Sequence, residues 1–156
     1  MDGDAPSRPT RRTVLGFGAG TLAGLAGCVA GSSSTPRKAD YDVGMSAIEF
    51  LPARLEVTVG TEVTWKNTNT RTHTVTAYED GIPPAAEYFA TGGYDSQAAA
   101  ESAYYNALEG GLVTDQTFSH TFEVPGEYAY FCIPHREAGM AGTIVVRPEG
   151  EGTTET

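Results

Sequence analysis

A short run near the C-terminal end of the chain carries the side chains best suited to bind a metal. Cys132, His135 and Met140 follow one another in the spacing Cys-x2-His-x4-Met, and a second imidazole, His73, lies far upstream. Two nitrogens, one thiolate and one soft, weak thioether are the ligand set of a mononuclear blue-copper site. The pattern therefore indicates one-electron transfer rather than bond-making catalysis.

Each of the four side chains has a chemical role in such a site. Cys132 must bind as a thiolate, and the metal itself favours loss of the thiol proton. His73 and His135 are the other strong donors, and Met140 is the long axial ligand. Gly139 permits the sharp turn that returns Met140 towards the metal.

Alternation of apolar and polar residues predicts the strands that must position these ligands. The alternating segments are 55–59, 63–66, 73–77, 118–122, 128–132 and 143–147. His73 has the same parity as Val75 and Ala77, so we expect it to point inward. Gly60-Thr61 predicts a hairpin turn. Short alternating strands between turn signals predict one antiparallel sandwich with a single core.

One segment departs from this alternation. Residues 96–108 predict a helix with Ser96 as its N-cap. The helix lies in a long insertion, residues 79–116, which we expect to cover the edge of the sandwich as a lid. His120, the third histidine, lies between two phenylalanines and is predicted to be structural.

The cysteine-containing run resembles a known family. Residues 132–140, CIPHREAGM, closely resemble the CAPHQGAGM type of loop in plastocyanins, and residues 124–131 resemble the strand that precedes it. Residues 50–66 are similar to the N-terminal half of halocyanins and related cupredoxins. The resemblance covers most of residues 41–147 and is weakest in the 79–116 insertion.

This resemblance implies both a fold and a site. The fold is an all-β, Greek-key cupredoxin β-sandwich, with a short helical insertion between the strand bearing His73 and the strand leading to Cys132. The site is a single type 1 copper ion. By matched position its ligands are His73, Cys132, His135 and Met140.

Two positions depart from the family pattern. Thr74 stands where the family commonly has an asparagine that helps to tie the first histidine's loop to the cysteine loop. Phe131 stands where plastocyanins commonly have a tyrosine associated with a second electron route. The resemblance therefore does not carry these two functions over to this chain.

The N-terminal segment has the features of an export signal. Arg11-Arg12 precede an uncharged apolar stretch, residues 14–26, which is too short to span a bilayer. This pattern predicts a twin-arginine signal. Residues 25–28, Leu-Ala-Gly-Cys, resemble a lipoprotein processing box, which predicts lipidation of Cys28; the alternative is an ordinary signal-peptidase site near a cysteine.

These features divide the chain into four parts. We expect a signal peptide at 1–27, a flexible tether at 28–40, a cupredoxin domain at 41–148 and a disordered acidic tail at 149–156. If a lipid occupies Cys28, Cys132 is unpaired, and a metal explains such a thiol in an exported protein. The expected location is the extracytoplasmic face of the cell membrane, through a lipid anchor.

The charge balance limits the kinds of binding partner that we expect. The chain has 10 basic and 20 acidic residues, and without residues 1–27 it would keep 7 basic and 18 acidic ones. Nucleic acid is not expected as a partner, because binding it needs basic patches. High acidity with two lysines favours a haloarchaeal protein, since high salt screens self-repulsion; the alternative is an ordinary acidic surface.

Three functions fit this set of features. The first is a membrane-tethered electron carrier, with redox partner proteins docking near His135 on an apolar patch of Ile133, Pro134, Ala138 and Ala141. The second is a copper storage or delivery protein. The third is a cupredoxin-like interaction domain without redox work. An enzyme is not expected, because copper enzymes need further histidine-rich sites and only His120 is left.

Overall fold

The computed structural model describes residues 40–150, which form two β-sheets, one α-helix and two 3-10 turns. The elements are β1 (Val43–Met45), β2 (Phe50–Leu51), β3 (Arg54–Thr58), β4 (Thr61–Asn67), β5 (Thr76–Ala77), η1 (Glu79–Gly81), α1 (Gln97–Ala107), β6 (Thr117–Phe122), β7 (Gly126–Phe131), η2 (Ile133–Ala138) and β8 (Ala141–Arg147). None of the helices within residues 40–150 is long and apolar enough to cross a bilayer.

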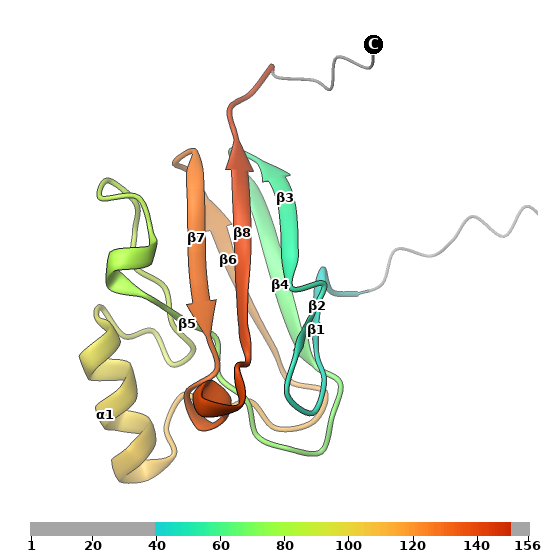
Figure 1. Cartoon of the computed structure of the whole chain (residues 1–156), viewed down its shortest axis with the longest axis vertical. Helices are drawn as coiled ribbons and strands as arrows, with labels where there is room; N and C mark the ends of the chain where they lie inside the picture. The colour runs from blue at the N-terminus through green and yellow to red at the C-terminus, as the bar shows by residue number, and fades with distance from the viewer. Residues whose placement is uncertain (1–39, 151–156) are drawn as a thin grey trace, which may run out of the picture. The chain divides into compact units, whose positions relative to one another are not determined.

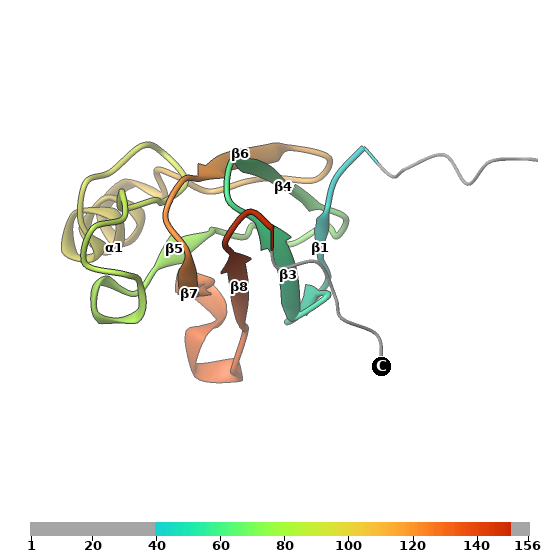
Figure 2. The same cartoon turned by 90° about the horizontal axis from the view of Figure 1, so that it is seen from above.

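The two sheets pack face to face as a sandwich. One sheet has the strand order β2-β1-β4-β6 and the other β3-β8-β7-β5. Figure 2 shows β4 and β6 in one layer and β3, β7 and β8 in the other. The predicted all-β sandwich with a helical insertion is therefore confirmed. The expectation of a wholly antiparallel arrangement is wrong, because β1 pairs with β4, and β3 with β8, in parallel.

The turn at Gly60 does not make the predicted hairpin. β3 pairs with β8, whereas β4 pairs with β1 and β6, so the two strands beside the turn belong to different sheets. Gly60 adopts a left-handed φ of 82°, which glycine reaches without steric cost. The turn therefore passes the chain from one layer of the sandwich to the other. Sequence alternation alone does not distinguish this connection from a hairpin.

Aromatic side chains fill the middle of the sandwich. The Trp65 ring lies 5.5 Å from that of Tyr130 and 6.1 Å from that of Phe89, between ring centroids. Phe122 and Tyr128 add to the same cluster, and their rings meet edge to face at 4.8 Å. Such rings bury large apolar areas in preferred geometries, which stabilises the two sheets against each other.

The insertion places helix α1 beside the β5 edge of the sandwich (Figure 1). Ser96 caps the helix, since its hydroxyl oxygen accepts a hydrogen bond from the Ala99 N–H at 3.2 Å. The helix ends at Ala107, and the backbone of its C-cap residue, Leu108, is in the left-handed conformation. The buried face of α1, with Ala100 and Tyr104, packs in one cluster with Phe131. The insertion therefore touches the strand that leads to Cys132.

Candidate metal centre

Cys132 follows β7 and begins a closed loop. Its N–H donates to the carbonyl of Met140 at 3.0 Å, and the Met140 N–H donates to the carbonyl of His135 at 3.2 Å. Gly139 makes the return possible with a left-handed φ of 84°. The side chains of Cys132 and Met140 are both buried. The backbone thus holds the thiol, the imidazole of His135 and the thioether on one short loop.

His73 reaches the same site from a distant part of the sequence. It lies in a single bridge with Leu112: the His73 N–H donates to the Leu112 carbonyl at 3.1 Å, and the Leu112 N–H donates back at 2.7 Å. Asn67 fixes this bridge, because its side-chain amide donates to the carbonyls of Leu112 and Arg71 at 2.8 and 2.7 Å. The insertion therefore holds the backbone of the first predicted ligand.

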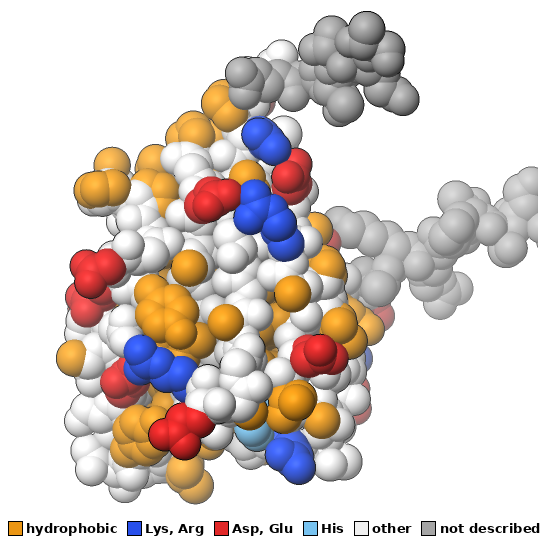
Figure 3. Space-filling view, viewed as in Figure 1, with side chains coloured by type: hydrophobic (Ala, Val, Ile, Leu, Met, Phe, Trp, Pro, Cys, Tyr) orange, Lys and Arg blue, Asp and Glu red, His pale blue; other side chains and the backbone are white. Residues whose placement is uncertain are grey.

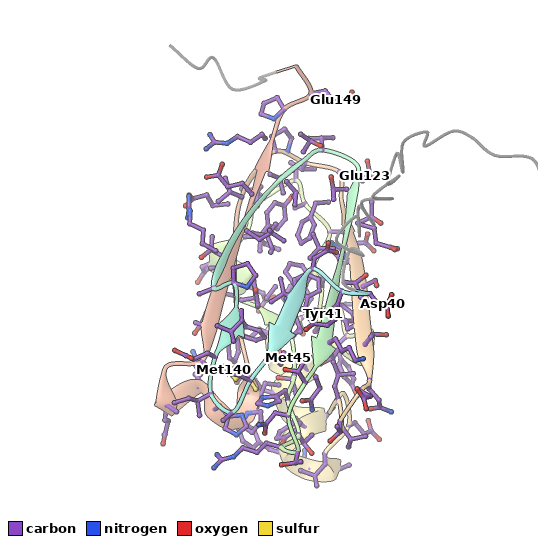
Figure 4. All side chains as sticks on the ribbon, turned by 90° about the vertical axis from the view of Figure 1, so that its right-hand side faces the viewer. Asp40, Tyr41, Met45, Glu123, Met140 and Glu149 are labelled. Carbon is purple, nitrogen blue, oxygen red and sulfur yellow. The ribbon has the colours of Figure 1, made fainter. Side chains whose placement is uncertain are left out.

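Three of the four predicted ligand groups meet within a few ångströms. The Sγ atom of Cys132 lies 3.6 Å from Nδ1 of His73 and 3.4 Å from Nδ1 of His135. The ligand atoms of these three residues all lie within 4.8 Å of one another. Backbone hydrogen bonds join Met140 to Cys132 and His135, and Figure 4 shows Met140 in the lower part of the domain. The sequence predicts that these four side chains lie together, although His73 and Met140 are 67 positions apart in the chain.

Burial keeps the nitrogen and sulfur groups uncharged when no ion is bound. Desolvation, helped by the nearby His135 and Arg71, lowers the pKa of His73 to about 4. Desolvation also lowers the pKa of His135 and raises that of the Cys132 thiol, which hydrogen bonds from Thr74 and His135 partly offset. Both imidazoles are therefore free to donate lone pairs at neutral pH.

This donor set fits a copper ion. With one thiolate and two neutral imidazoles, Cu(II) leaves a net charge of about +1 and Cu(I) leaves none, so neither state buries a large charge. The thioether of Met140 is a soft donor, which suits copper and is a poor ligand for zinc. His73, Cys132, His135 and Met140 are therefore positioned for a single type 1 copper site.

Thr74 supplies a contact that the family pattern did not lead us to expect. Its backbone N–H points to Sγ of Cys132 at 3.4 Å, and its side-chain oxygen accepts a hydrogen bond from the Ile133 N–H at 2.8 Å. Threonine thus ties the His73 segment to the cysteine loop. The signal for this function was present in the sequence, since a hydroxyl can accept such a bond, but only the fold brings Ile133 to it.

His135 lies at the outer side of the site. Its side chain is half-buried, whereas His73 is fully buried. In Figure 3 a histidine surface is visible at the lower end, with apolar side chains and a basic side chain next to it. Pro134, Ala138 and Ala141 are exposed, as predicted for an apolar patch there, but Ile133 is not part of that surface. Ile133 is buried because it packs in the cluster beneath α1.

Arg136, next to His135, connects the cysteine loop to the insertion. Its Nη1 atom lies 2.9 Å from Oε1 of Glu101 on α1. Its guanidinium lies over the Phe131 ring, 4.6 Å from the centroid, and 5.4 Å from that of Tyr78. Stacking and pairing both favour arginine here. The helix is thereby joined to the loop that carries three of the predicted ligands.

The remaining histidine lies away from the site. The His120 ring stacks on Phe89 at 4.7 Å and meets Phe122 edge to face at 4.9 Å. It is absent from the cluster of His73, Cys132 and His135, which agrees with its predicted structural role. Cys28, the predicted lipidation site, lies outside the described residues.

Comparison with known proteins gives the same family. The family described as "Copper binding proteins, plastocyanin/azurin family" matches residues 37–147. The chain is 31% identical over 151 residues to the chloroplastic plastocyanin of Tetradesmus obliquus, covering 92% of this chain and 93% of that one. It is 32% identical over 127 residues to that of Chlamydomonas reinhardtii, covering 81% and 77%.

Two solved structures are similar to this chain. The copper-containing nitrite reductase of Thermus scotoductus matches with a TM-score of 0.50 and 26% identity, over 67% of this chain and 21% of that chain. An amicyanin variant matches with a TM-score of 0.48 and 26% identity, over 67% and 79%. The likeness to the reductase thus covers about a fifth of that enzyme.

The fold and the site together define a blue copper protein of the cupredoxin class, whose plastocyanin relatives are electron carriers. The chain belongs to the plastocyanin/azurin family of copper-binding proteins. The predicted family, fold and cofactor are thereby confirmed.

Proposed function

We propose that this protein carries single electrons between redox partner proteins outside the cytoplasm, tethered to a membrane by a lipid on Cys28. The observation that carries the redox part is the buried cluster of His73, Cys132 and His135, with both Nδ1 atoms within 3.6 Å of the thiol sulfur. His73, Cys132 and His135 would hold the copper ion as strong donors, and Met140 would add a weak, soft thioether.

A bound copper ion supplies one-electron chemistry by alternating between Cu(II) and Cu(I). The protein residues keep the ligands in one arrangement for both states. The Cys132–Met140 and Met140–His135 backbone bonds hold the loop, and the Leu112 bridge holds His73. Little then has to move when an electron arrives, which lowers the barrier to transfer.

Electrons enter and leave at the His135 side. His73 is sealed by its neighbours, whereas His135 is half-buried beside exposed Pro134 and Ala138. A small apolar surface favours close contact of short duration, as an electron carrier needs. Partner proteins therefore dock around His135, as the sequence indicates.

The tether and the location rest on the sequence alone. Arg11-Arg12, the short apolar stretch after them and the Leu-Ala-Gly-Cys run support export and lipidation of Cys28. The acidic composition supports a haloarchaeal origin. Mass spectrometry of the protein from its native membrane should find a lipid on an N-terminal Cys28; an unmodified form starting elsewhere would refute the anchor.

Visible spectroscopy with a redox titration tests the electron carrier. The Cu(II) protein should show an intense visible charge-transfer band from the thiolate, which reductant bleaches and oxidant restores. Cys132→Ser should abolish the band, whereas His120→Ala, which removes a histidine outside the cluster, should leave it. A colourless protein that binds Cu(I) alone would contradict electron transport and favour copper storage or delivery.

A further inference from the structure

Two buried threonines beside the cysteine form a chain of hydroxyl groups. The Thr76 hydroxyl donates to the Thr74 hydroxyl oxygen at 3.3 Å. The same Thr74 oxygen accepts from the Ile133 N–H at 2.8 Å. Both threonine side chains are almost completely shielded, with exposed fractions of 1% for Thr74 and 0% for Thr76.

This arrangement determines where the Thr74 proton can go. A hydroxyl has two acceptor lone pairs and one O–H donor. Ile133 and Thr76 occupy both lone pairs, so the Thr74 O–H must donate to a third group. A buried donor left without a partner destabilises the folded state. The sulfur of Cys132, which already receives the Thr74 backbone N–H at 3.4 Å, lies beside it.

We infer that Thr74 and Thr76 together set the reduction potential of the site, by directing the Thr74 hydroxyl proton onto the Cys132 sulfur. The inference rests on the proposed electron-carrier function. Thr74 and Thr76 are positioning residues: Thr74 acts on the sulfur, and Thr76 acts on Thr74. Thr74, just before β5, and Thr76, in β5, thus act on the cysteine that follows β7.

The sign of the effect follows from charge. The sulfur carries more negative charge in the reduced, Cu(I) state than in the Cu(II) state, where it shares electrons with the metal. A hydrogen bond to sulfur therefore stabilises the reduced state more. Hydrogen bonding around the cysteine sulfur is a recognised control of potential in such sites. Loss of the Thr74 proton should make the protein harder to reduce.

The test compares the copper-loaded wild type with Thr74→Val, Thr74→Ser and Thr76→Val, by redox titration and visible spectrum. Thr74→Val should favour oxidation roughly three- to tenfold in the exchange equilibrium with a redox partner, a fall of about 30–60 mV for one electron. The charge-transfer band should move to longer wavelength. Thr74→Ser, which keeps the hydroxyl, should restore both values.

Thr76→Val separates the hydroxyl chain from simple packing. Among the described residues Thr76 makes its side-chain hydrogen bond to Thr74 and none to the cysteine loop. Its removal frees a lone pair on Thr74, so the potential should fall by a smaller amount in the same direction. The matched control is Thr91→Val, since the Thr91 hydroxyl is also buried and accepts a bond, from the Val75 N–H at 3.3 Å.

The outcomes are distinct. If Thr74→Val and Thr76→Val keep the wild-type potential and band, or if Thr91→Val shifts them equally, the inference is wrong while the copper carrier stands. If Thr74→Val does not fold, Thr76→Val and Thr74→Ser decide the question. If the wild type itself shows no reversible visible band, the proposed function fails first.

Discussion

The middle of the sandwich and its metal-binding end are packed by different kinds of side chain. The middle is filled by apolar and aromatic residues around Trp65. The polar residues that are buried within residues 40–150 lie instead on or against the His73 segment: Asn67, His73, Thr74, Thr76 and Thr91. One end of the same small domain therefore holds these buried polar residues, whereas the centre is mainly aromatic and aliphatic.

This difference shows that stability and metal binding depend on different parts of the domain. Burying a polar group costs free energy unless it is hydrogen-bonded. Apart from His73, the other four buried polar side chains make such bonds, either to one another or to nearby backbone groups. The aromatic centre stabilises the fold, and the polar end uses part of that stability to hold a thiol and two imidazoles in one place.

The largest effect should come from the aromatic centre. Trp65→Ala removes a fully buried ring that contacts Phe89, Phe118, Phe122 and Tyr130. It should lower the free energy of unfolding by about 3–5 kcal/mol, measured by denaturant titration of the copper-free protein. Where the variant still folds, its copper band should resemble the wild type. A changed band would mean that the two regions are not separate.

A smaller loss is expected at the polar end. Asn67→Ala removes a buried amide that donates to the carbonyls of Leu112 and Arg71. The free energy of unfolding should fall by about 1–3 kcal/mol. Because Leu112 holds the His73 backbone, copper affinity should also fall, which Trp65→Ala should not cause. A competition titration with a copper chelator measures the copper affinity of each variant.

Asn106→Ala is the matched control for Asn67. The Asn106 side chain lies on the exposed face of α1 and bonds the Ser102 hydroxyl at 3.1 Å. Asn106→Ala should change the free energy of unfolding and the copper affinity little. Equal losses in the two variants would contradict a special function for the buried asparagine.

The smallest effect near neutral pH should come from protonation. The folded protein lowers the pKa of His73 to about 4 from its ordinary 6.5, chiefly by desolvation, and burial also lowers the pKa of His120. Between these values the unfolded chain binds more protons, so stability is complete above about pH 6.5 and falls as pH drops towards 4. Denaturant titrations of the copper-free protein between pH 7 and 4.5 measure this slope.

Single variants show how much each region contributes to this pH dependence of stability. His73→Asn should flatten it more than His120→Asn, because His73 is fully buried at the polar end while Glu87 partly opposes the lowered pKa of His120. The reverse order would place the main titrating group in the aromatic centre. Bound copper should also flatten the slope, since it occupies His73.

Much of the site could be predicted before any fold was known. Cys132, His135 and Met140 are close in sequence, so their spacing alone brings them onto one loop. The helix at 97–107 was predicted from its Ser96 cap and its spacing, because both signals are local. The connection at Gly60 was not, since a turn between two alternating strands has the same sequence pattern whether the strands pair or belong to different sheets.

The sequence by itself determined the ligand types, the loop that carries three of them and the alternation that forms two sheets, because these depend on neighbouring residues. Only the tertiary structure decided how His73 meets that loop, why Leu112 and Asn67 hold it, and that Thr74 takes over the tie to Ile133. These contacts join residues about 40 to 60 positions apart, and strand order and register bring them within hydrogen-bonding distance.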